Sequence, residues 1–456
     1  MIKNPYYKGD LKPKNIDRRE FLKHLGGGVI VVYTMGNMTL MQACSRKEEE
    51  KLADFNAFLR IGEDGKVDCF SGKIEMGQGV NTSIPQVLAE ELEVDMHSIH
   101  MVMGDTELCP FDEGTWGSMT TRFHDPLIRA AAAEAREILK ELASKKLDVA
   151  IDQLIVKNGV VYDSNDESKK ISYAELTRGQ KIVKTLNEKP PVKKASEFNL
   201  IGKSFYRLDA EEKVTGKALY SGDIRLPGMK YAAIKRPPAI GATLKSADTS
   251  AAESMEGVEI IRENDFIVAL HDYPETAIQA AAKIKAEWEP PQVMADDKTI
   301  FDYIVKSADE SEVVEQSGDL EAGKKGSEIV VEEQYVDGYK AHASIETHTA
   351  TAVFEDGKLT MWASSQTPFG TRQAISDTFK LPLEKVHLKQ IYLGGGFGGK
   401  IYNHQAIEAA RIAILSKKPI QLAWSRREEF MYDLFHTAGV IRINSGVSKD
   451  GKINHW

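Results

Sequence analysis

The order of apolar and polar residues predicts alternating strands and helices in the first part of the chain. Residues 55–70 predict a hairpin, because an Asp-Gly turn signal separates two apolar runs. Apolar residues at helical spacing predict a helix over residues 84–92. A longer helix is expected over residues 125–147, with Asp125 as its N-cap. This alternation indicates an α+β or α/β unit.

The second part of the chain is richer in strand-like runs. A helix is predicted over residues 276–288, and the acidic, weakly periodic residues 291–327 predict a loop or linker. Further helices are expected at residues 371–379 and 405–416, and a strand over residues 386–393.

The end of the sequence reads as one half of a hairpin. Residues 440–444 alternate like a half-buried strand, and residues 449–452 form a turn signal that leaves few residues for the partner strand before Trp456. A domain is not expected to stop inside a hairpin. We therefore expect this sequence to be part of a longer polypeptide.

The first residues resemble an export signal of the twin-arginine type. Residues 17–23 read Asp-Arg-Arg-Glu-Phe-Leu-Lys, and residues 25–35 form an apolar stretch too short to span a membrane. The alternative is the start of an amphipathic helix, but the glycines at 26–28 would weaken it by roughly 1 kcal/mol each. Export into the periplasm with a preloaded cofactor is the expectation.

Residues 40–45 resemble a lipoprotein processing site. Alanine precedes Cys44, and a charged tether follows it, although Gln42 departs from the usual small residue. Two outcomes remain open: lipidation of Cys44, which gives a lipid-anchored protein, or cleavage by a signal peptidase nearby. Either outcome would start the mature protein near residue 45.

Composition and charge exclude several classes of function. The chain has 456 residues, which is enough for two or more domains. Its content of 42% hydrophobic and 28% charged residues is typical of globular proteins. The net charge of -9 offers no basic surface for a phosphate backbone, so nucleic acid is not an expected partner.

The cysteine content limits the redox centres that this chain can hold. Cys44, Cys69 and Cys109 are too few to supply the four thiolates of an iron-sulfur cluster. Any such cluster must lie in another chain. Cys69 and Cys109 are expected either to form a disulfide or to remain as two buried thiols.

A glycine-rich run at residues 394–400, with the sequence Gly-Gly-Gly-Phe-Gly-Gly-Lys, follows a predicted strand and precedes a predicted helix. Its glycines let the backbone approach a ligand and present N–H groups to phosphate or to a metal-bound oxygen. The spacing also satisfies the phosphate-binding pattern of nucleotide hydrolases. That interpretation fails because Ile401 stands where Ser or Thr must hold magnesium.

This run resembles a signature of the large subunits of molybdenum hydroxylases, the family of xanthine dehydrogenase and aldehyde oxidase. Five more segments resemble parts of the same family and lie at residues 75–79, 115–118, 216–224, 341–348 and 364–369. Several short matches spread along the chain are more specific than any one alone.

The order of these segments resembles the permuted β subunit of isoquinoline 1-oxidoreductase, because the Met-Gly-Gln-Gly loop at 76–79 precedes the segment at 216–224. That resemblance implies a molybdopterin cytosine dinucleotide cofactor. It also implies a small partner subunit with 2Fe-2S clusters, and a cytochrome c as a candidate electron acceptor. An α+β, multi-domain architecture with mixed sheets and flanking helices is implied as well.

The resemblance also implies the division of the chain. The expected parts are a signal (1–44), a tether (45–54), a permuted molybdopterin-binding segment (55–180), a linker (181–200), a smaller hammerhead-like α/β domain (201–290), a second linker (291–330) and an incomplete molybdopterin-binding domain (331–456).

By resemblance, Gln366 hydrogen-bonds an oxygen on molybdenum, and the backbone of Phe397 and Gly117 lies beside the metal. The residues expected to hold the pterin and the dinucleotide are Gln78, Gly79, Thr115, Gly117, Ser118, Gly395, Gly396, Phe397 and Gly398.

Each of these residues has a plainer interpretation. Thr115 and Ser118 are common turn residues, Gln78 suits a surface loop, and Phe397 suits core packing. The histidines at 342 and 348 are expected to be structural, because the sulfur ligands of this metal come from the pterin.

The catalytic base is not found in this sequence. In the family it is a glutamate in a Gly-x-Gly-Glu segment, which is absent here, so we expect it beyond Trp456. We assign no such role to Glu75, Glu90 or Glu346. The missing base also fits a different class, an exported binding protein of the same fold without activity.

The resemblance implies that the enzyme hydroxylates a carbon atom with oxygen from water. Purine-oxidising relatives carry a glutamate after the Gly-Gly-Lys, where this chain has Ile401. A purine is therefore disfavoured, and an aldehyde or an N-heteroaromatic compound is expected as substrate.

Overall fold

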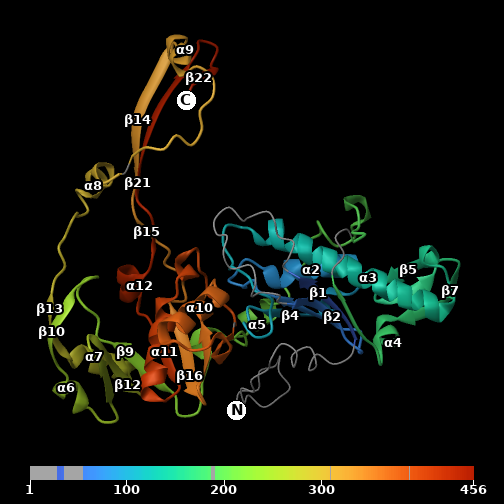
Figure 1. Cartoon of the computed structure of the whole chain (residues 1–456), viewed down its shortest axis with the longest axis horizontal. Coiled ribbons are helices and arrows are strands. Elements are labelled where there is room, and N and C mark those ends of the chain that lie inside the picture. The colour runs from blue at the N-terminus through green and yellow to red at the C-terminus, as the bar shows by residue number, and fades with distance from the viewer. Residues whose placement is uncertain (1–27, 35–54, 186–189, 309, 390) are drawn as a thin grey trace. The chain divides into compact units, whose positions relative to one another are not determined.

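The computed structural model describes residues 28–34, 55–185, 190–308, 310–389 and 391–456 (Figure 1). These residues form two compact units. The first unit contains residues up to 235 together with 249–284 and 344–425, and the second contains 236–248, 285–343 and 426–456. The predicted twin-arginine motif, Cys44 and the tether at 45–54 lie outside the described residues.

The first unit contains three sheets. One has the order β4-β3-β2-β1-β8, with strands β4 (Ile99–Met103), β3 (Val67–Ser71), β2 (Phe55–Ile61), β1 (Gly28–Thr34) and β8 (Lys181–Thr185). A seven-stranded sheet has the order β11 (Glu259–Glu263), β12 (Phe266–His271), β9 (Lys230–Ile234), β19 (Ile420–Ala423), β16 (Thr349–Glu355), β17 (Lys358–Ala363) and β18 (Val386–Lys389). The smallest contains β5 (Leu154–Lys157), β6 (Val160–Asp163) and β7 (Asp166–Ser172).

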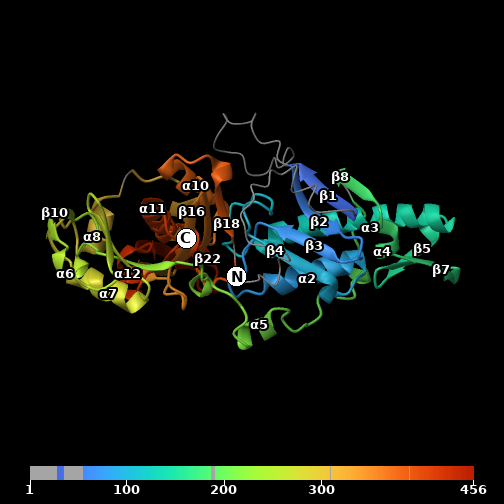
Figure 2. The same cartoon turned by 90° about the horizontal axis from the view of Figure 1, so that it is seen from below.

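The helices of the first unit cover these sheets. They are α2 (Val80–Leu92), α3 (Asp125–Leu147), α4 (Tyr173–Thr177), α5 (Ala210–Val214), α6 (Ser250–Glu253), α7 (Pro274–Lys283), α10 (Pro368–Phe379) and α11 (His404–Ser416). Helices α2 and α3 pack together against the sheet that contains β1, while α10 and α11 lie beside β16 and β18 (Figures 1 and 2). The mixed sheets with flanking helices confirm the predicted α+β class.

The predicted hairpin at 55–70 is confirmed by antiparallel β2 and β3, which pair Leu59 with Cys69. Leu59, Cys69, Leu88 and Leu139 are buried in one apolar core between the sheet and its helices. The predicted helix at 84–92 starts earlier, at Val80. The helix at 125–147 has the predicted bounds, but His124 takes the N-cap position in place of Asp125, because a π-helical turn over Thr120–His124 leads into α3.

Strand β1 lies inside the region predicted as a signal. It pairs antiparallel with β2 and parallel with β8, and its Val29 and Ile30 are fully buried. Gly28 has a φ of +127°, and a Cβ there would lie 2.2 Å from the carbonyl oxygen of Ile61. An apolar run of this kind suits a buried strand as well as an export leader. The fold uses it as a strand.

The predicted linker at 181–200 is partly structured. Its first residues form β8, and residues 193–201 are held by two buried carboxylates of α2. Glu90 accepts the backbone N–H groups of Leu200 and Ile201 at 2.6 and 3.0 Å. Burial raises the pKa of Glu90. The hydrogen bonds from these N–H groups and from the Lys193 ammonium lower it by more, so the pKa lies below its usual value.

The second unit consists mainly of small antiparallel sheets of two or three strands, with short helices. Its elements are β10 (Thr243–Asp248), β13 (Lys285–Glu289), α8 (Ile300–Lys306), α9 (Leu320–Lys325), β14 (Ile329–Asp337), β15 (Lys340–Ala341), α12 (Arg426–Tyr432), β20 (Phe435–His436), β21 (Gly439–Val447) and β22 (Ile453–His455). Antiparallel β21 and β22 confirm the predicted C-terminal hairpin.

One predicted helix has different bounds in the structure, and one predicted loop or linker contains short helices. The helix predicted over 276–288 ends at Lys283, because Ala286 and Trp288 alternate with charged residues and pair in β13 with β10. The segment 291–327, predicted as a loop or linker, contains the two short helices α8 and α9.

The two cysteines in the described part of the chain are free and buried. The predicted alternative of a disulfide between Cys69 and Cys109 is therefore wrong, and the alternative of two buried thiols is confirmed. Burial raises the pKa of both thiols, which makes them poor nucleophiles. In the same described residues, no helix combines the length and the apolar character needed to cross a bilayer.

Candidate functional site

Gln366 joins three loops of the first unit. Its side chain is 1% exposed. The amide nitrogen donates to the carbonyl oxygen of Thr115 at 2.8 Å, and the amide oxygen accepts the N–H groups of Gly398 and Lys400 at 3.0 and 3.3 Å. The Thr115 N–H also donates to the Gln366 carbonyl oxygen at 3.0 Å. The structure therefore brings the predicted residues at 115–118, 366 and 395–398 together.

The glycine-rich loop at residues 394–400 leaves N–H groups available for a ligand. Within the described residues, the N–H groups of Gly395, Gly396 and Phe397 make no hydrogen bond. A Cβ on Gly396 would lie 2.4 Å from the amide oxygen of Gln366, so only glycine allows this close approach. Three consecutive unpaired N–H groups are suited to bind anionic or metal-bound oxygen atoms.

Two non-glycine residues of the site have left-handed backbone conformations. Ser118 has a φ of +55° and Phe397 a φ of +58°. This conformation is unfavourable for a residue with a side chain, so the surrounding contacts must stabilise it. Phe397 is also 73% exposed, so the interpretation that it packs in the core is wrong. Its ring is instead available to cover a ligand.

The loop at residues 112–118 is built on buried polar contacts. The Thr115 hydroxyl accepts the N–H of Ile74 at 2.9 Å. The Lys73 ammonium donates to the Asp112 carboxylate and to the Gly114 carbonyl oxygen, both at 2.9 Å. Thr115 is thus more than a turn residue, because its backbone meets Gln366 and its hydroxyl meets the segment that follows β3. Gly117 and Ser118 are exposed at the end of this loop.

The loop at residues 75–79 is folded around one buried carboxylate. Glu75 accepts the N–H groups of Gly77, Gly79 and Asn81 at 2.8, 3.2 and 3.1 Å. Gln78 closes the same loop, because its side chain donates to the Ile74 carbonyl oxygen and accepts the Met76 N–H, both at 2.8 Å. The expectation that Gln78 and Gly79 hold the cofactor stays a prediction. Most of their polar groups are already bonded within the loop.

Basic residues neutralise Glu75 from a distant part of the sequence. Arg207 lies 3.0 Å from Glu75 and 2.9 Å from Asp209, and Lys213 lies 2.6 Å from Asp209. Burial raises the pKa of Asp209, but Arg207 and Lys213 lower it more, so this carboxyl group stays ionised. The network fastens residues 207–213 to the loop at 75–79.

A buried pair of titratable groups follows the loop at 112–118. The His124 ring lies 2.9 Å from the Ser71 hydroxyl, and burial lowers the pKa of His124 to about 4. Burial raises the pKa of its neighbour Asp125 to about 6, which the Thr121 hydroxyl offsets in part. Asp125 has no ion-pair partner among the described residues. His124 is therefore neutral at pH 7, and Asp125 carries an uncompensated charge.

The two histidines predicted to be structural make contacts that suit that role. In the second unit, the His342 ring lies 2.9 Å from the carbonyl oxygen of Leu434. In the first unit, His348 lies 3.2 Å from the Gly399 carbonyl oxygen and its ring packs 5.1 Å from that of Trp424.

Three charged residues of the site were missed by sequence reasoning. Lys400 is fully buried and lies 3.0 Å from Glu346, while Glu75 organises the Met-Gly-Gln-Gly loop. Nothing in the local sequence indicates a structural role for either glutamate. A buried lysine requires a nearby acid, but the sequence shows neither that Lys400 is buried nor which acid lies beside it.

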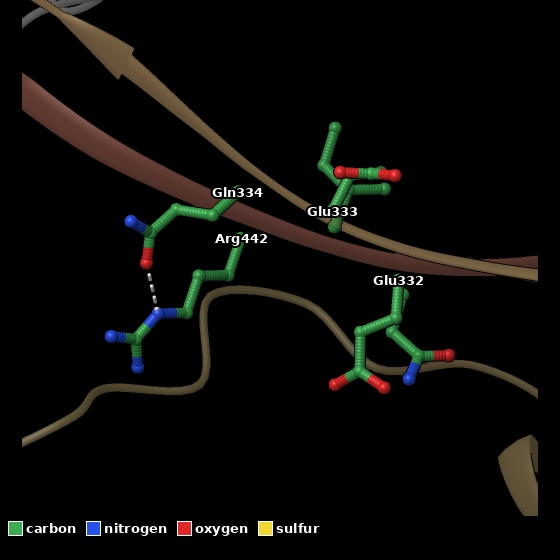
Figure 3. Close-up of a pocket in the computed structure, with 6 residues that line it drawn as sticks. Glu332, Glu333, Gln334 and Arg442 are labelled. Atoms are coloured by element: carbon green, nitrogen blue, oxygen red, sulfur yellow. Dashed lines mark hydrogen bonds between the residues drawn. The ribbon is translucent and has the colours of Figure 1, made fainter.

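The second unit contains an open depression of about 300 Å³ on β14 and β21. Figure 3 shows Glu332, Glu333, Gln334 and Arg442 around it, with Arg442 donating to Gln334 at 3.0 Å. It contains none of the predicted site residues. Most of its side chains are exposed, so it has little in common with an enclosed cofactor site.

The residues of the first unit fit a pterin dinucleotide with a bound metal. The unpaired N–H groups at 395–397 suit the oxygen atoms of a pyrophosphate or of a metal centre. The amide nitrogen of Gln366 has two N–H groups, of which Thr115 takes one. Gly77, Gly79 and Gly117 all have positive φ, and a Cβ on either of the first two would meet no atom within 4 Å. The backbone there is open to a ligand.

Comparison with known proteins agrees with this geometry. Two family profiles match, each described as a molybdopterin cofactor-binding domain, one over residues 6–221 and the other over residues 305–456. Together they include every predicted site residue.

Curated relatives share this similarity over most of the chain. One of the subunits of nicotinate dehydrogenase from Pseudomonas putida is 28% identical over 406 residues, which cover 87% of this chain and 34% of the relative. The β subunit of isoquinoline 1-oxidoreductase from Brevundimonas diminuta is 24% identical over 451 residues, which cover 87% of this chain and 58% of the relative. The chain thus spans between about a third and three fifths of the length of these relatives.

Among solved structures, quinoline 2-oxidoreductase from Pseudomonas putida 86 aligns with 56% of this chain and 38% of its own, at a TM-score of 0.45 and 22% identity. The profile matches and the curated relatives are sufficient to identify the family. This chain belongs to the molybdopterin-binding subunits of the xanthine dehydrogenase family.

Proposed function

We propose that the protein is a molybdenum-dependent oxidoreductase that hydroxylates an aldehyde or an N-heteroaromatic carbon with oxygen from water. The observation that supports this most directly is the run of unpaired N–H groups at Gly395, Gly396 and Phe397, held beside the buried amide of Gln366. Such an arrangement is of use to a ligand rich in oxygen atoms. Unpaired N–H groups do not contribute to the packing of the loop.

The residues around Gln366 have the following roles in this proposal. The N–H groups at 395–397 bind oxygen atoms of the cofactor, and the second N–H of Gln366 donates to an oxygen close to the metal. The backbone at Gly117 and Ser118 closes the opposite side, and the Phe397 ring limits the entry of water. When bound, the cofactor supplies a redox-active metal that takes two electrons from the substrate carbon.

The electrons leave through a partner, in this proposal a small subunit with 2Fe-2S clusters. The two described cysteines are buried and free, and three in all are too few for a cluster. The Brevundimonas diminuta relative is by its name one of several subunits, which agrees with a multi-subunit enzyme. A cytochrome c is the proposed final acceptor, and the cofactor is proposed to be the cytosine dinucleotide form.

For the substrate we propose an aldehyde or an N-heterocycle and not a purine. Ile401 follows the Gly-Gly-Lys and offers no acidic side chain to a purine. The names of the relatives, nicotinate dehydrogenase and isoquinoline 1-oxidoreductase, support an N-heterocycle. Incubation with each class in ¹⁸O-labelled water, followed by mass spectrometry of the product, tests the substrate class and the oxygen source together.

Export through the twin-arginine route, with lipidation of Cys44, is also a proposal. It is supported by the sequence at residues 17–23 and 40–45. Replacing Arg18 and Arg19 by lysine should retain the protein in the cytoplasm, and Cys44→Ala should release it from the membrane fraction. Unchanged fractionation of both variants would exclude this proposal.

The test of the proposed enzyme is metal and nucleotide analysis of the full-length protein purified with its partner subunits. We expect about one molybdenum per chain and release of a cytidine nucleotide on acid treatment. Gly396→Ala should lower both, because its Cβ would collide with Gln366. The control is Gly338→Ala, where a Cβ meets no atom within 4 Å.

Absence of molybdenum and of cytidine nucleotide from the native protein would overturn the proposal and favour an inactive binding protein. Equal loading of the Gly396→Ala variant and the native protein would show that the cofactor lies elsewhere.

A further inference from the structure

Lys400, the last residue of the glycine-rich loop, carries a charge that the proposed function does not use. Its side chain is 0% exposed, which is rare for lysine. The ammonium lies 3.0 Å from the carboxylate of Glu346 and donates to the carbonyl oxygen of the same residue at 2.7 Å. A buried charge persists only with a well-placed partner. This ion pair therefore connects two segments that are 54 residues apart.

Glu346 also holds the first residue of the loop. The same carboxylate oxygen accepts the N–H of Gly394 at 2.8 Å, and the Glu346 N–H donates to the Gly394 carbonyl oxygen at 3.1 Å. A Cβ on Gly394 would lie 2.5 Å from that of Glu346. Glu346 thus binds the loop at Gly394, while Lys400 binds Glu346 from the other end of the loop.

The backbone of Lys400 carries the effect to Gln366. Its N–H donates to the amide oxygen of Gln366 at 3.3 Å, and its carbonyl oxygen accepts the Gln366 N–H at 2.8 Å. A displacement of Lys400 would move the amide of Gln366, which in turn meets Thr115. The ion pair thus supports the contacts that Gln366 makes with Lys400 and Thr115.

The positive charge of Lys400 is paired with a carboxylate inside the protein. In a phosphate-binding loop the lysine reaches out to the ligand. Here Lys400 is buried and neutralised by Glu346, so the N–H groups at 395–397 are what remains for an anionic ligand. In this arrangement the ion pair holds the loop, and the backbone N–H groups are left to bind the ligand.

We propose that the Lys400–Glu346 ion pair is a clamp that holds both ends of the loop 394–400, and so positions its free N–H groups and Gln366 for the cofactor. The clamp rests on the proposed function, because it is the cofactor that the loop would bind. Lys400 and Glu346 are positioning residues, since neither offers its charge to the ligand.

The test uses the full-length protein with its partner subunits and three variants: Lys400→Met, Lys400→Arg, and the double variant Lys400→Met with Glu346→Gln. The matched control is Lys245→Met, which breaks an exposed pair with Glu289 at 3.7 Å. For each protein we would measure molybdenum per chain and the melting temperature. Hydrogen exchange of residues 391–401 would be measured on protein prepared without cofactor.

The double variant is the decisive one, because it removes both charges and leaves no unpaired buried charge. It should therefore fold even if Lys400→Met alone does not. We expect its melting temperature to lie close to that of the native protein, its loop amides to exchange faster, and its molybdenum content to fall about tenfold. Lys400→Arg keeps the charge and should recover part of the loading. Lys245→Met should match the native protein.

Native loading and native exchange of the double variant would overturn the clamp. So would a loss of molybdenum that only follows loss of folding, since that marks an ordinary structural pair. If the native protein holds no molybdenum, the proposed function fails while the hydrogen-exchange comparison still decides for or against the clamp.

Discussion

The two glycine-rich loops of the site, at residues 75–79 and 394–400, are each organised by buried charge but leave different groups free. In the first, the Glu75 carboxylate takes the N–H groups of Gly77 and Gly79. In the second, Glu346 and Lys400 hold only the two ends of the loop. The N–H groups between them stay unpaired among the described residues.

The difference shows that glycine content alone does not define a binding loop. In the loop at 75–79, the backbone N–H groups of Gly77 and Gly79 donate to the Glu75 carboxylate of the same loop. The loop therefore offers a ligand mainly an open backbone surface. The loop at 394–400 is fastened at its ends and keeps its central donors for a ligand. Capacity to bind follows from where the internal hydrogen bonds are made.

The largest effect is expected at the loop with free donors. Gly396→Ala places a Cβ 2.4 Å from the Gln366 amide oxygen and should lower the free energy of unfolding by about 3 kcal/mol. Urea denaturation followed by circular dichroism measures it, with Gly338→Ala as the unstrained control. A loss no larger than that of the control would mean that the loop and Gln366 are not in contact.

Glu75→Gln should have the next largest effect, because it removes the charge that gathers three backbone N–H groups and Arg207. We expect a loss of about 2 kcal/mol in unfolding free energy. Addition of salt should weaken the native protein more than the variant. If Glu75→Gln is as stable as the native protein, the loop at 75–79 does not depend on its carboxylate.

Asp125 provides a contrast with Glu75, since it is a buried carboxyl group without an ion-pair partner in the described residues. Burial raises its pKa to about 6, above the unfolded value of about 3.9. Ionisation therefore opposes folding as the pH rises from about 4 to about 6, and the cost stays constant above that range.

Asp125→Asn should remove this cost. The variant should be more stable than the native protein above pH 6 by on the order of 1 kcal/mol, after allowance for solvent screening, and equally stable near pH 4. Melting temperatures across this pH range measure the difference. A stability gap that is the same at pH 4 and pH 7 would contradict the role of ionisation.

The smallest effect is expected for Gln78→Ala. Its side chain makes two hydrogen bonds inside an exposed loop, so the loss in unfolding free energy should be about 0.5–1 kcal/mol. Molybdenum content of the same variant sharpens the comparison of the loops. A decrease as large as that of Gly396→Ala would place Gln78 at the cofactor and not only within its own loop.

Local patterns predicted the regular elements of the first unit well. The bounds of α3 follow from its apolar spacing, and the β2–β3 hairpin follows from its Asp-Gly turn. The prediction failed at 276–288, where Ala286 and Trp288 fit helical spacing but pair across strands. Periodicity over so few residues cannot separate the two, and only the partner strand decides.

The candidate site was predicted from motifs in part. They identified Gln366 and the residues at 395–398, which the structure brings together with Thr115. The ion pair of Lys400 with Glu346 could not be predicted, because the two residues are far apart in sequence and meet only through the fold. Motifs name the groups that face a ligand, whereas the groups that hold them depend on tertiary contacts.

Strand β1 has a consequence for processing of the protein. It is hydrogen-bonded on one edge to β2 and on the other to β8. A cut between Thr34 and Phe55 would break the covalent link to β2 and leave both ladders of hydrogen bonds intact. The product would be a complemented pair of chains, comparable to a split protein, and its refolding would become bimolecular and dependent on concentration.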